Sequence, residues 1–244
     1  MDIRIAENAS ELGKNAGLLA AEILRGALKS QPRARVIVAT GASQFETLAT
    51  LTSEPGIDWN RVDGFHLDEY IGLSADHPAS FCGYLRDRFV TKVPIGSFHY
   101  LNGLGDPAHV IAGASQALRA APIDLALIGI GENGHLAFND PPADFETTEQ
   151  YHIVSLDEAC RQQQVGEGWF ASLADVPTRA FSMTISAILA SKAIVCSVPD
   201  ERKAIAVRNA LEGPLTPDVP ASILRNHPNL TLVLDKASAS RLSK

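Results

Sequence analysis

Residues 121–142 have the sequence APIDLALIGIGENGHLAFNDPP, in which an almost continuous apolar run passes directly into a cluster of glycines. An apolar run as short as residues 123–130, bounded by a proline and glycines, is typical of a strand buried on both faces of a parallel sheet. Polar residues follow at once, namely His135, Asn139 and Asp140. Because ligands of open parallel sheets bind beyond the carboxyl ends of the strands, this segment is the first candidate for chemistry.

Residues 129–134 also match G-x-G-x-x-G, the pattern of dinucleotide-binding sites. That pattern requires a helix that begins at the third glycine and holds the pyrophosphate at its amino end. Pro141 and Pro142 would stop such a helix early, and the segment lies in the middle of the chain. The sequence therefore disfavours a nicotinamide or flavin site. A glycine-rich turn with a structurally engaged histidine remains an alternative to a catalytic segment.

Strand-like and helix-like segments alternate along the rest of the chain. Strands are expected at residues 3–5, 35–39, 61–67, 98–101, 123–130, 151–156, 180–185, 193–198 and 230–234. Amphipathic helices are expected near residues 10–30, 45–51, 79–89, 106–121 and 200–211, with one helical turn at 221–225. This alternation predicts an α/β protein with a single doubly wound, mostly parallel sheet and helices on both faces, a Rossmann-like three-layer fold. We expect residues 1–244 to form a single domain.

The composition excludes several classes of partner. The net charge is −7 and no basic run occurs, which argues against nucleic acid or an anionic membrane as partner. An anionic substrate would then need a local cationic pocket. No apolar run approaches the length of a membrane span and no signal-like start is present, so we expect a cytoplasmic protein. The three cysteines are widely spaced and the seven histidines lack close ligand spacing, so we expect no metal.

Two segments have the features of a phosphate site. The turn after the second expected strand contains Thr40, Gly41, Ala42 and Ser43 and leads into a helix. Backbone N–H groups and the helix dipole favour an anion at such a junction, although Ser43 could simply cap the helix. Arg202 and Lys203 fall in the first turn of the helix after Asp200, where the dipole disfavours cations. Either both side chains are solvated, or Lys203 reaches across the carboxyl edge of the sheet to a phosphate.

An acidic pair, Asp68 and Glu69, follows the third expected strand. Because side chains alternate along a strand, we expect His66 and Asp68 to face one side and Phe65 and Leu67 the other. An aspartate at a strand end is either a turn residue or a general base. The turn interpretation fits poorly, because no glycine or asparagine follows closely.

Together these motifs resemble the glucosamine-6-phosphate deaminase family over nearly the whole chain. The resemblance is carried by TGAS at 40–43, FHLDEY at 65–70, GIGENGHLAFNDP at 129–141, and Lys203. The related 6-phosphogluconolactonases share the fold and the Gly-His step, but FNDP at 138–141 favours the deaminase side. The resemblance implies conversion of glucosamine 6-phosphate to fructose 6-phosphate and ammonia, without a cofactor.

The resemblance also implies a role for each site residue. Asp68 would move a proton between C2 and C1 of the opened sugar. His135 would open the pyranose ring with the help of Asp140, which stands where the family commonly has glutamate. Lys203 and the turn at 40–43 would hold the phosphate. Gly134 and Glu69 complete the predicted set of substrate-binding residues.

The sequence departs from the family pattern at several positions. Asn133 stands where the best-known members carry aspartate, and an amide cannot titrate, so we expect Asn133 only to position His135. The arginine of an N-S-R-F-F segment that clamps phosphate in many members is missing. The nearest match is GEGWF at 166–170, and Arg161 is a candidate replacement. Residues 143–148 lack the basic residues of the allosteric hexameric members, so we expect a monomer or small homo-oligomer.

Two alternatives remain open for the function. A 6-phosphogluconolactonase, or another phosphosugar hydrolase of the same fold, would use a histidine to activate water and would not require Asp68. A non-catalytic sugar-phosphate sensor would normally carry a helix-turn-helix segment, whereas residues 1–30 are expected to form one strand and one helix. The preferred prediction is an isomerising deaminase with a phosphorylated amino sugar as its small-molecule partner.

Overall fold

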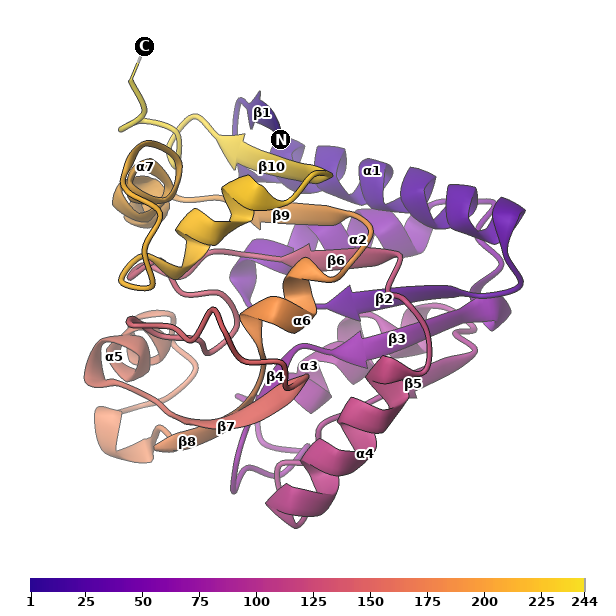
Figure 1. The fold of residues 1–244 in the computed structure, drawn as a ribbon, viewed down its shortest axis with the longest axis horizontal. Coiled ribbons are helices and arrows are strands. Elements are labelled where there is room, and N and C mark those ends of the chain that lie inside the picture. The colour runs from indigo at the N-terminus through magenta and orange to yellow at the C-terminus, as the bar shows by residue number, and fades with distance from the viewer. Residues whose placement is uncertain (244) are drawn as a thin grey trace.

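The centre of the computed structural model, which describes residues 1–243, is a parallel sheet of seven strands (Figure 1). The strand order is β1-β10-β9-β6-β2-β3-β5. The strands are β1 (Asp2–Ala6), β2 (Ala34–Val38), β3 (Val62–His66), β5 (Ser97–His99), β6 (Leu125–Ile128), β9 (Ile194–Val198) and β10 (Leu230–Asp235). The apolar run that precedes the glycine cluster is thus the middle strand, β6, and the predicted parallel α/β sheet is confirmed.

Helices cover both faces of this sheet, as predicted. One face packs against α1 (Ala9–Ser30), α2 (Phe45–Ser53) and α3 (Phe81–Arg88), and the other against α4 (Pro107–Arg119), α6 (Ile185–Leu189) and α7 (Ala204–Glu212). In Figure 1, α2 lies behind the sheet and α6 in front of it. The alternation of side chains along β6 explains both cores. Leu125 and Leu127 join the cluster around α1, whereas Ala126 and Ile128 join the opposite cluster.

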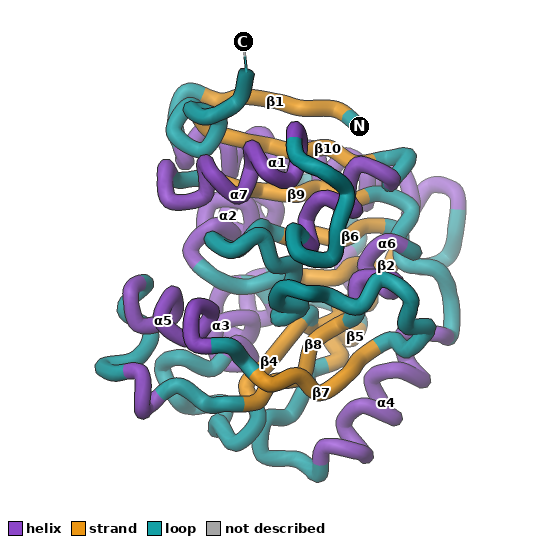
Figure 2. The backbone as a smooth tube through the Cα atoms, turned by 60° about the vertical axis from the view of Figure 1, so that its left-hand side comes forward, coloured by secondary structure: helices purple, strands orange, loops and turns teal. Residues whose placement is uncertain are grey.

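A second, smaller sheet contains two of the predicted strand regions, 151–156 and 180–185, and a third strand that was not predicted. It has the order β4-β8-β7, with β4 (Asp68–Tyr70), β7 (Tyr151–Ser155) and β8 (Arg179–Met183) paired in antiparallel fashion. Figure 2 shows these strands together with α5 (Glu158–Gly166) nearby. The expected strand at 61–67 therefore ends at His66, and Leu67 carries the chain from the large sheet into the small one. Strand pattern alone did not separate the two sheets.

Several short elements complete the fold. The 3-10 helices are η1 (Ala42–Gln44), η2 (Trp59–Arg61), η3 (Val90–Lys92), η4 (Leu173–Asp175), η5 (Glu201–Lys203) and η6 (Pro220–Asn226). α5 and α6 are not predicted by the sequence pattern, because residues 141–176 show little regular apolar periodicity and α6 is a single short turn. Of the helices in residues 1–243, none is long and apolar enough to span a membrane.

Candidate active site

A cavity of about 380 Å³ lies at the carboxyl edge of the large sheet. Its walls include residues that follow or end the strands β2, β3, β6, β9 and β10, namely Ala39, Thr40, Leu67, Gly129, Ile130, Pro199 and Asp235. The predicted site residues that also line it are Gly41, Ala42, Ser43, Asp68, His135 and Lys203. The edge at which parallel strands end has thus gathered residues that are far apart in the sequence.

The turn after β2 has a backbone shape that suits close approach to a ligand. Gly41 has φ +92°, a conformation that favours glycine, and its carbonyl accepts a hydrogen bond from the Tyr84 hydroxyl at 3.0 Å. The turn continues through η1 into α2, so free backbone N–H groups lie at the cavity wall. A side chain at Gly129 would place its Cβ 3.1 Å from the Ser43 hydroxyl, so glycine keeps the two walls of the cavity close together.

Asp68 is one of two buried aspartates in the lining of this cavity, and the other is Asp235. Asp68 is 7% exposed, and it begins β4 directly after Leu67, which lines the same wall. Burial raises the pKa of Asp68 to about 8, and the nearby Glu69 carboxylate adds to this shift. A carboxyl group that titrates this close to neutral pH can exchange a proton with a bound molecule.

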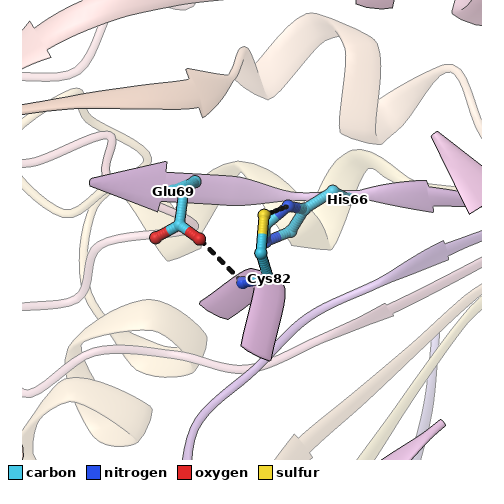
Figure 3. A group of neighbouring side chains, drawn as sticks. All are labelled: His66, Glu69 and Cys82. Carbon is cyan, nitrogen blue, oxygen red and sulfur yellow. Dashed lines mark hydrogen bonds between the residues drawn. The ribbon is translucent and has the colours of Figure 1, made fainter. Parts of the chain in front are cut away.

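Glu69 does not line the cavity, contrary to the prediction that it binds substrate. Its Oε1 accepts hydrogen bonds from the backbone N–H groups of Tyr70 and Phe81. Its Oε2 accepts from the Ser80 hydroxyl at 2.9 Å and from the Cys82 N–H at 2.7 Å, the bond drawn in Figure 3. Glu69 therefore joins β4 to the first turn of α3 beneath the cavity wall. Burial raises the pKa of Glu69, although these hydrogen bonds oppose the shift.

His66 is also enclosed and, unlike Asp68, does not line the cavity, whereas Phe65 and Leu67 join one hydrophobic cluster, as expected. His66 Nδ1 accepts a hydrogen bond from the Leu101 N–H at 3.3 Å and lies 3.8 Å from Cys82 Sγ (Figure 3). Burial lowers its pKa to about 3, so the imidazole is neutral at physiological pH. β3 ends at His66 and β4 begins at Asp68, and the two strands belong to different sheets.

His66, Glu69 and Cys82 also form one of two groups of potential metal ligands within residues 1–243. Their ligand atoms lie within 4.8 Å of one another. In this group each Glu69 oxygen already accepts two hydrogen bonds, and His66 Nδ1 accepts one. The group is thus explained as a buried hydrogen-bonded cluster. In the second group, formed by His135, Asp140 and Cys160, the imidazole and carboxylate are hydrogen-bonded to each other.

His135 lines the cavity and forms a buried pair with Asp140, whereas Asp140 and Asn133 are not themselves lining residues. His135 Nδ1 lies 3.0 Å from Asp140 Oδ1, and the side chains are 10% and 9% exposed. Burial opposes ionisation of Asp140, but hydrogen bonds from His135 and Asn133 outweigh it, so the pKa of Asp140 lies below its usual value. An ionised carboxylate only accepts hydrogen bonds, so Nδ1 donates. The other ring nitrogen, Nε2, is then available to a ligand in the cavity.

Gly131 lets the His135 ring come close to the backbone. A Cβ atom at Gly131 would lie 2.3 Å from His135 Nε2, so any side chain there would displace the ring. Gly134 has φ +87°, and its carbonyl accepts a hydrogen bond from the Ala221 N–H. Gly134 shapes this loop but, contrary to the prediction, does not line the cavity. The glycines of the G-x-G-x-x-G match thus support a histidine rather than a pyrophosphate.

Two cations reach the cavity from η5. Lys203 is 8% exposed, and its ammonium lies 3.7 Å from a Glu167 carboxylate oxygen and 3.8 Å from a Glu132 oxygen. Burial lowers the pKa of Lys203, although both carboxylates oppose that shift. Arg202, which the sequence analysis did not select, also lines the cavity and is paired with Asp200 at 2.8 Å.

Arg161 does not replace the missing arginine in this cavity. Its guanidinium donates to the Leu173 carbonyl, and Arg161 is not among the lining residues. The α5 segment instead contributes Gln163, Gln164 and Glu167 to the wall. These three residues were not predicted as site residues, because no helix is expected over residues 161–164. Once a helix begins at Glu158, residues 163, 164 and 167 share one face.

Comparison with known proteins places this site in a family. The sequence profile described as glucosamine-6-phosphate isomerases/6-phosphogluconolactonase matches residues 7–233. A glucosamine-6-phosphate deaminase of Lactobacillus delbrueckii subsp. bulgaricus is 36% identical over 243 residues, covering 99% of this chain and all of that protein. The Oenococcus oeni protein of the same name is 38% identical over 85% of this chain and 86% of its own length.

The solved structures agree with these matches. A structure described as a monomeric glucosamine-6-phosphate deaminase superposes with a TM-score of 0.89 at 32% identity, covering 99% of this chain and all of that chain. The 6-phosphogluconolactonase of Trypanosoma brucei superposes with a TM-score of 0.80 over 99% of this chain and 98% of its own, but at 17% identity it shares the fold alone. The chain therefore belongs to the family of glucosamine-6-phosphate isomerases and 6-phosphogluconolactonases.

Proposed function

We propose that the protein converts a hexosamine 6-phosphate into the corresponding ketose 6-phosphate and ammonia, with glucosamine 6-phosphate as the expected substrate. The observation that carries this proposal is one cavity lined both by Asp68, whose pKa is about 8, and by His135, which is hydrogen-bonded to Asp140 behind the cavity lining. Relatives named glucosamine-6-phosphate deaminase, 36% and 38% identical to this chain, support the same activity.

In this proposal His135 and Asp140 open the sugar ring. His135 donates a proton to the ring oxygen as the bond between that oxygen and C1 breaks, and the C1 hydroxyl gives up its proton to solvent, which yields the open-chain aldehyde. Asp140 keeps the imidazole oriented and stabilises its protonated form. Asn133 donates to the same Asp140 oxygen at 3.0 Å and accepts from the His135 N–H at 3.0 Å, so it fixes the pair without titrating.

Asp68 then carries out the isomerisation. The ionised carboxylate takes the proton from C2 while the C1 oxygen gains a proton from the substrate ammonium group, which gives an enolamine. The carboxyl group then returns its proton to C1, which gives a ketimine. Water adds at C2 and ammonia leaves, so the ketose 6-phosphate forms without an external oxidant or cofactor. A buried carboxyl with a raised pKa suits this task, because it gains and loses a proton at nearly equal free energy near neutral pH.

The phosphate binds at the turn 40–43 and at Lys203. Both line the cavity, and the turn supplies backbone N–H groups at the start of a helix. The working unit is a monomer or a small homo-oligomer. A solved relative of 32% identity, described as monomeric, supports the smaller form.

An ammonia-release assay tests the proposed reaction. Purified protein is incubated with glucosamine, galactosamine and mannosamine 6-phosphates, and ammonia and ketose phosphate are measured together. The same preparation is assayed for hydrolysis of 6-phosphogluconolactone. Equal release of ammonia and ketose phosphate from one hexosamine, lost in Asp68→Asn, supports the proposal. Lactone hydrolysis that survives Asp68→Asn, with no ammonia from any hexosamine, favours the lactonase alternative.

A further inference from the structure

The cation expected to hold the phosphate lies between two carboxylates. Lys203 Nζ is 3.7 Å from Glu167 Oε1 and 3.8 Å from Glu132 Oε1. Both distances exceed a normal hydrogen bond, so the Lys203 N–H groups remain available to a ligand while the positive charge is offset. The Lys203 and Glu167 side chains are 10% and 12% exposed, so little solvent screens this interaction.

Glu167 is fixed in place by its own neighbours. The Gln163 amide donates to Glu167 Oε1 at 2.8 Å, and the Trp169 indole N–H donates to Oε2 at 3.2 Å. Gln163 and Glu167 both line the cavity. Movement of the carboxylate away from Lys203 would therefore break two hydrogen bonds. A ligand at Lys203 meets a carboxylate that cannot simply withdraw.

The cavity as a whole holds more acidic than basic side chains. The acidic residues in its lining are Asp68, Glu167, Asp200 and Asp235, and the basic ones are Arg202 and Lys203. Glu132 adds a further carboxylate, 3.6 Å from the Arg202 guanidinium. A phosphate dianion therefore enters a site whose two cations are already paired. The segment 166–170 has brought a carboxylate to this cavity where an arginine was expected from the resemblance.

We propose that Glu167 determines the charge state in which the phosphate binds, because a phosphate held by Lys203 shares a proton with the Glu167 carboxylate. The inference rests on the proposed function in taking Lys203 as the phosphate end of the cavity. A phosphate monoester has a second pKa of about 6 and is mainly a dianion at pH 8. A dianion is repelled by a fixed carboxylate. A monoanion donates its P–O–H to Glu167 and keeps one negative charge for Lys203.

Proton balance then follows directly. At pH 8 the free ligand is a dianion, and the bound pair of phosphate and Glu167 carries one additional proton that comes from the solvent. The other titratable groups near Glu167 are Lys203 and Arg202 from η5, Glu132 from the loop after β6, and Tyr70 from β4. Burial raises the pKa of Tyr70 well above its usual value, so its hydroxyl stays protonated at pH 8.

Isothermal titration calorimetry with glucitol 6-phosphate tests the proposal, because this open-chain monoester has no amino group and cannot be deaminated. Binding is measured at pH 6.5 and 8.0, each in two buffers with different ionisation enthalpies. We expect wild type to take up close to one proton at pH 8.0 and to bind about 25-fold more weakly there than at pH 6.5, because the monoanion fraction of the free ligand falls by that factor. At pH 8.0, Glu167→Gln should take up fewer protons than wild type on binding. It should also bind glucitol 6-phosphate on the order of tenfold more tightly than wild type.

The matched control is Glu158→Gln, which removes the same charge from an exposed position in α5 and should behave as wild type. Absence of proton uptake in wild type would overturn the proposal without any variant. Equal or weaker binding by Glu167→Gln, or no binding by either protein, would also overturn it. The titrations could give the expected proton uptake and the expected effect of Glu167→Gln while no hexosamine 6-phosphate yields ammonia. In that case the proposed reaction fails and the role of Glu167 stands.

Discussion

His135 Nδ1 lies 3.0 Å from Asp140 Oδ1, and the Asn133 amide donates to the same oxygen at 3.0 Å. The Asn133 carbonyl in turn accepts from the His135 backbone N–H. One amide side chain thus holds both partners of the pair. Because Asn133 has no proton to lose, the only carboxylate hydrogen-bonded to the imidazole in residues 1–243 is that of Asp140.

Asp140→Asn should slow ring opening more than the later steps. The variant removes the carboxylate that stabilises the protonated imidazole, and general acid catalysis typically contributes at least about 10²-fold. We expect turnover of the natural pyranose to fall by about that factor. The measurement compares this substrate with an amino-sugar phosphate analogue that cannot cyclise. A much smaller defect on the open-chain analogue is expected, whereas equal defects would assign Asp140 to proton transfer or to structure.

Gly131→Ala should disable His135 without removing it. The new Cβ would lie 2.3 Å from Nε2 in the present geometry, so the ring must move. A displacement of about 1 Å at a reacting group can cost about 10²-fold in rate. We expect kcat/KM to fall by that order. Gly113→Ala, at an exposed position of α4 with no atom within 4 Å, is the control and should retain full activity. Wild-type activity in Gly131→Ala would show that the ring position is not critical.

Lys203→Ala and Arg161→Ala should differ in phosphate binding. Lys203 lines the cavity, and loss of a hydrogen bond to a charged group costs about 1.5–3 kcal/mol, or roughly 10- to 150-fold in affinity. Arg161 donates to Leu173 away from the cavity, so its loss should lower the melting temperature and leave affinity nearly unchanged. Calorimetry and thermal unfolding of both variants decide this. Strongly weakened phosphate binding in Arg161→Ala would show that Arg161 contributes to the phosphate site.

The free energy of unfolding should fall as pH rises, because the buried Asp68 carboxyl loses its proton. Its pKa is about 8 in the folded protein and 3.8 in the unfolded chain, so between these values the folded state holds the additional proton. This contribution is fully present below pH 3.8 and is lost as pH rises through 8, with a slope of at most about 1.4 kcal/mol per pH unit. Denaturant unfolding at pH 6 and 9 should show a smaller loss in Asp68→Asn. Identical losses would show that Asp68 does not carry a raised pKa.

The large sheet and the position of the cavity could be predicted because they follow from local patterns. Residues 123–130 are apolar enough to mark the middle strand, and the glycines after it mark the carboxyl edge. The pairing of His135 with Asp140 was also predictable, since the two residues are five positions apart in one loop. These features need no knowledge of contacts between distant segments.

The errors arose where distant segments decide the outcome. Glu69 was assigned to substrate because it follows Asp68, but its orientation depends on N–H groups of α3 more than ten residues later. Arg161 was selected for its charge, but the helix that contains it turns Gln163, Gln164 and Glu167 to the cavity instead. Short-range periodicity does not determine which face of a polar helix meets a distant sheet edge.

Exchange of the C2 proton of glucosamine 6-phosphate with solvent tests the central claim most directly. The substrate is incubated in deuterated buffer with wild type or Asp68→Asn, and deuterium at C2 and C1 is followed by NMR. Wild type should incorporate deuterium together with ammonia release, and Asp68→Asn should bind the sugar phosphate but exchange at least about 10²-fold more slowly. Exchange at the wild-type rate in Asp68→Asn would contradict the assignment of Asp68 as the base, and with it the proposed mechanism.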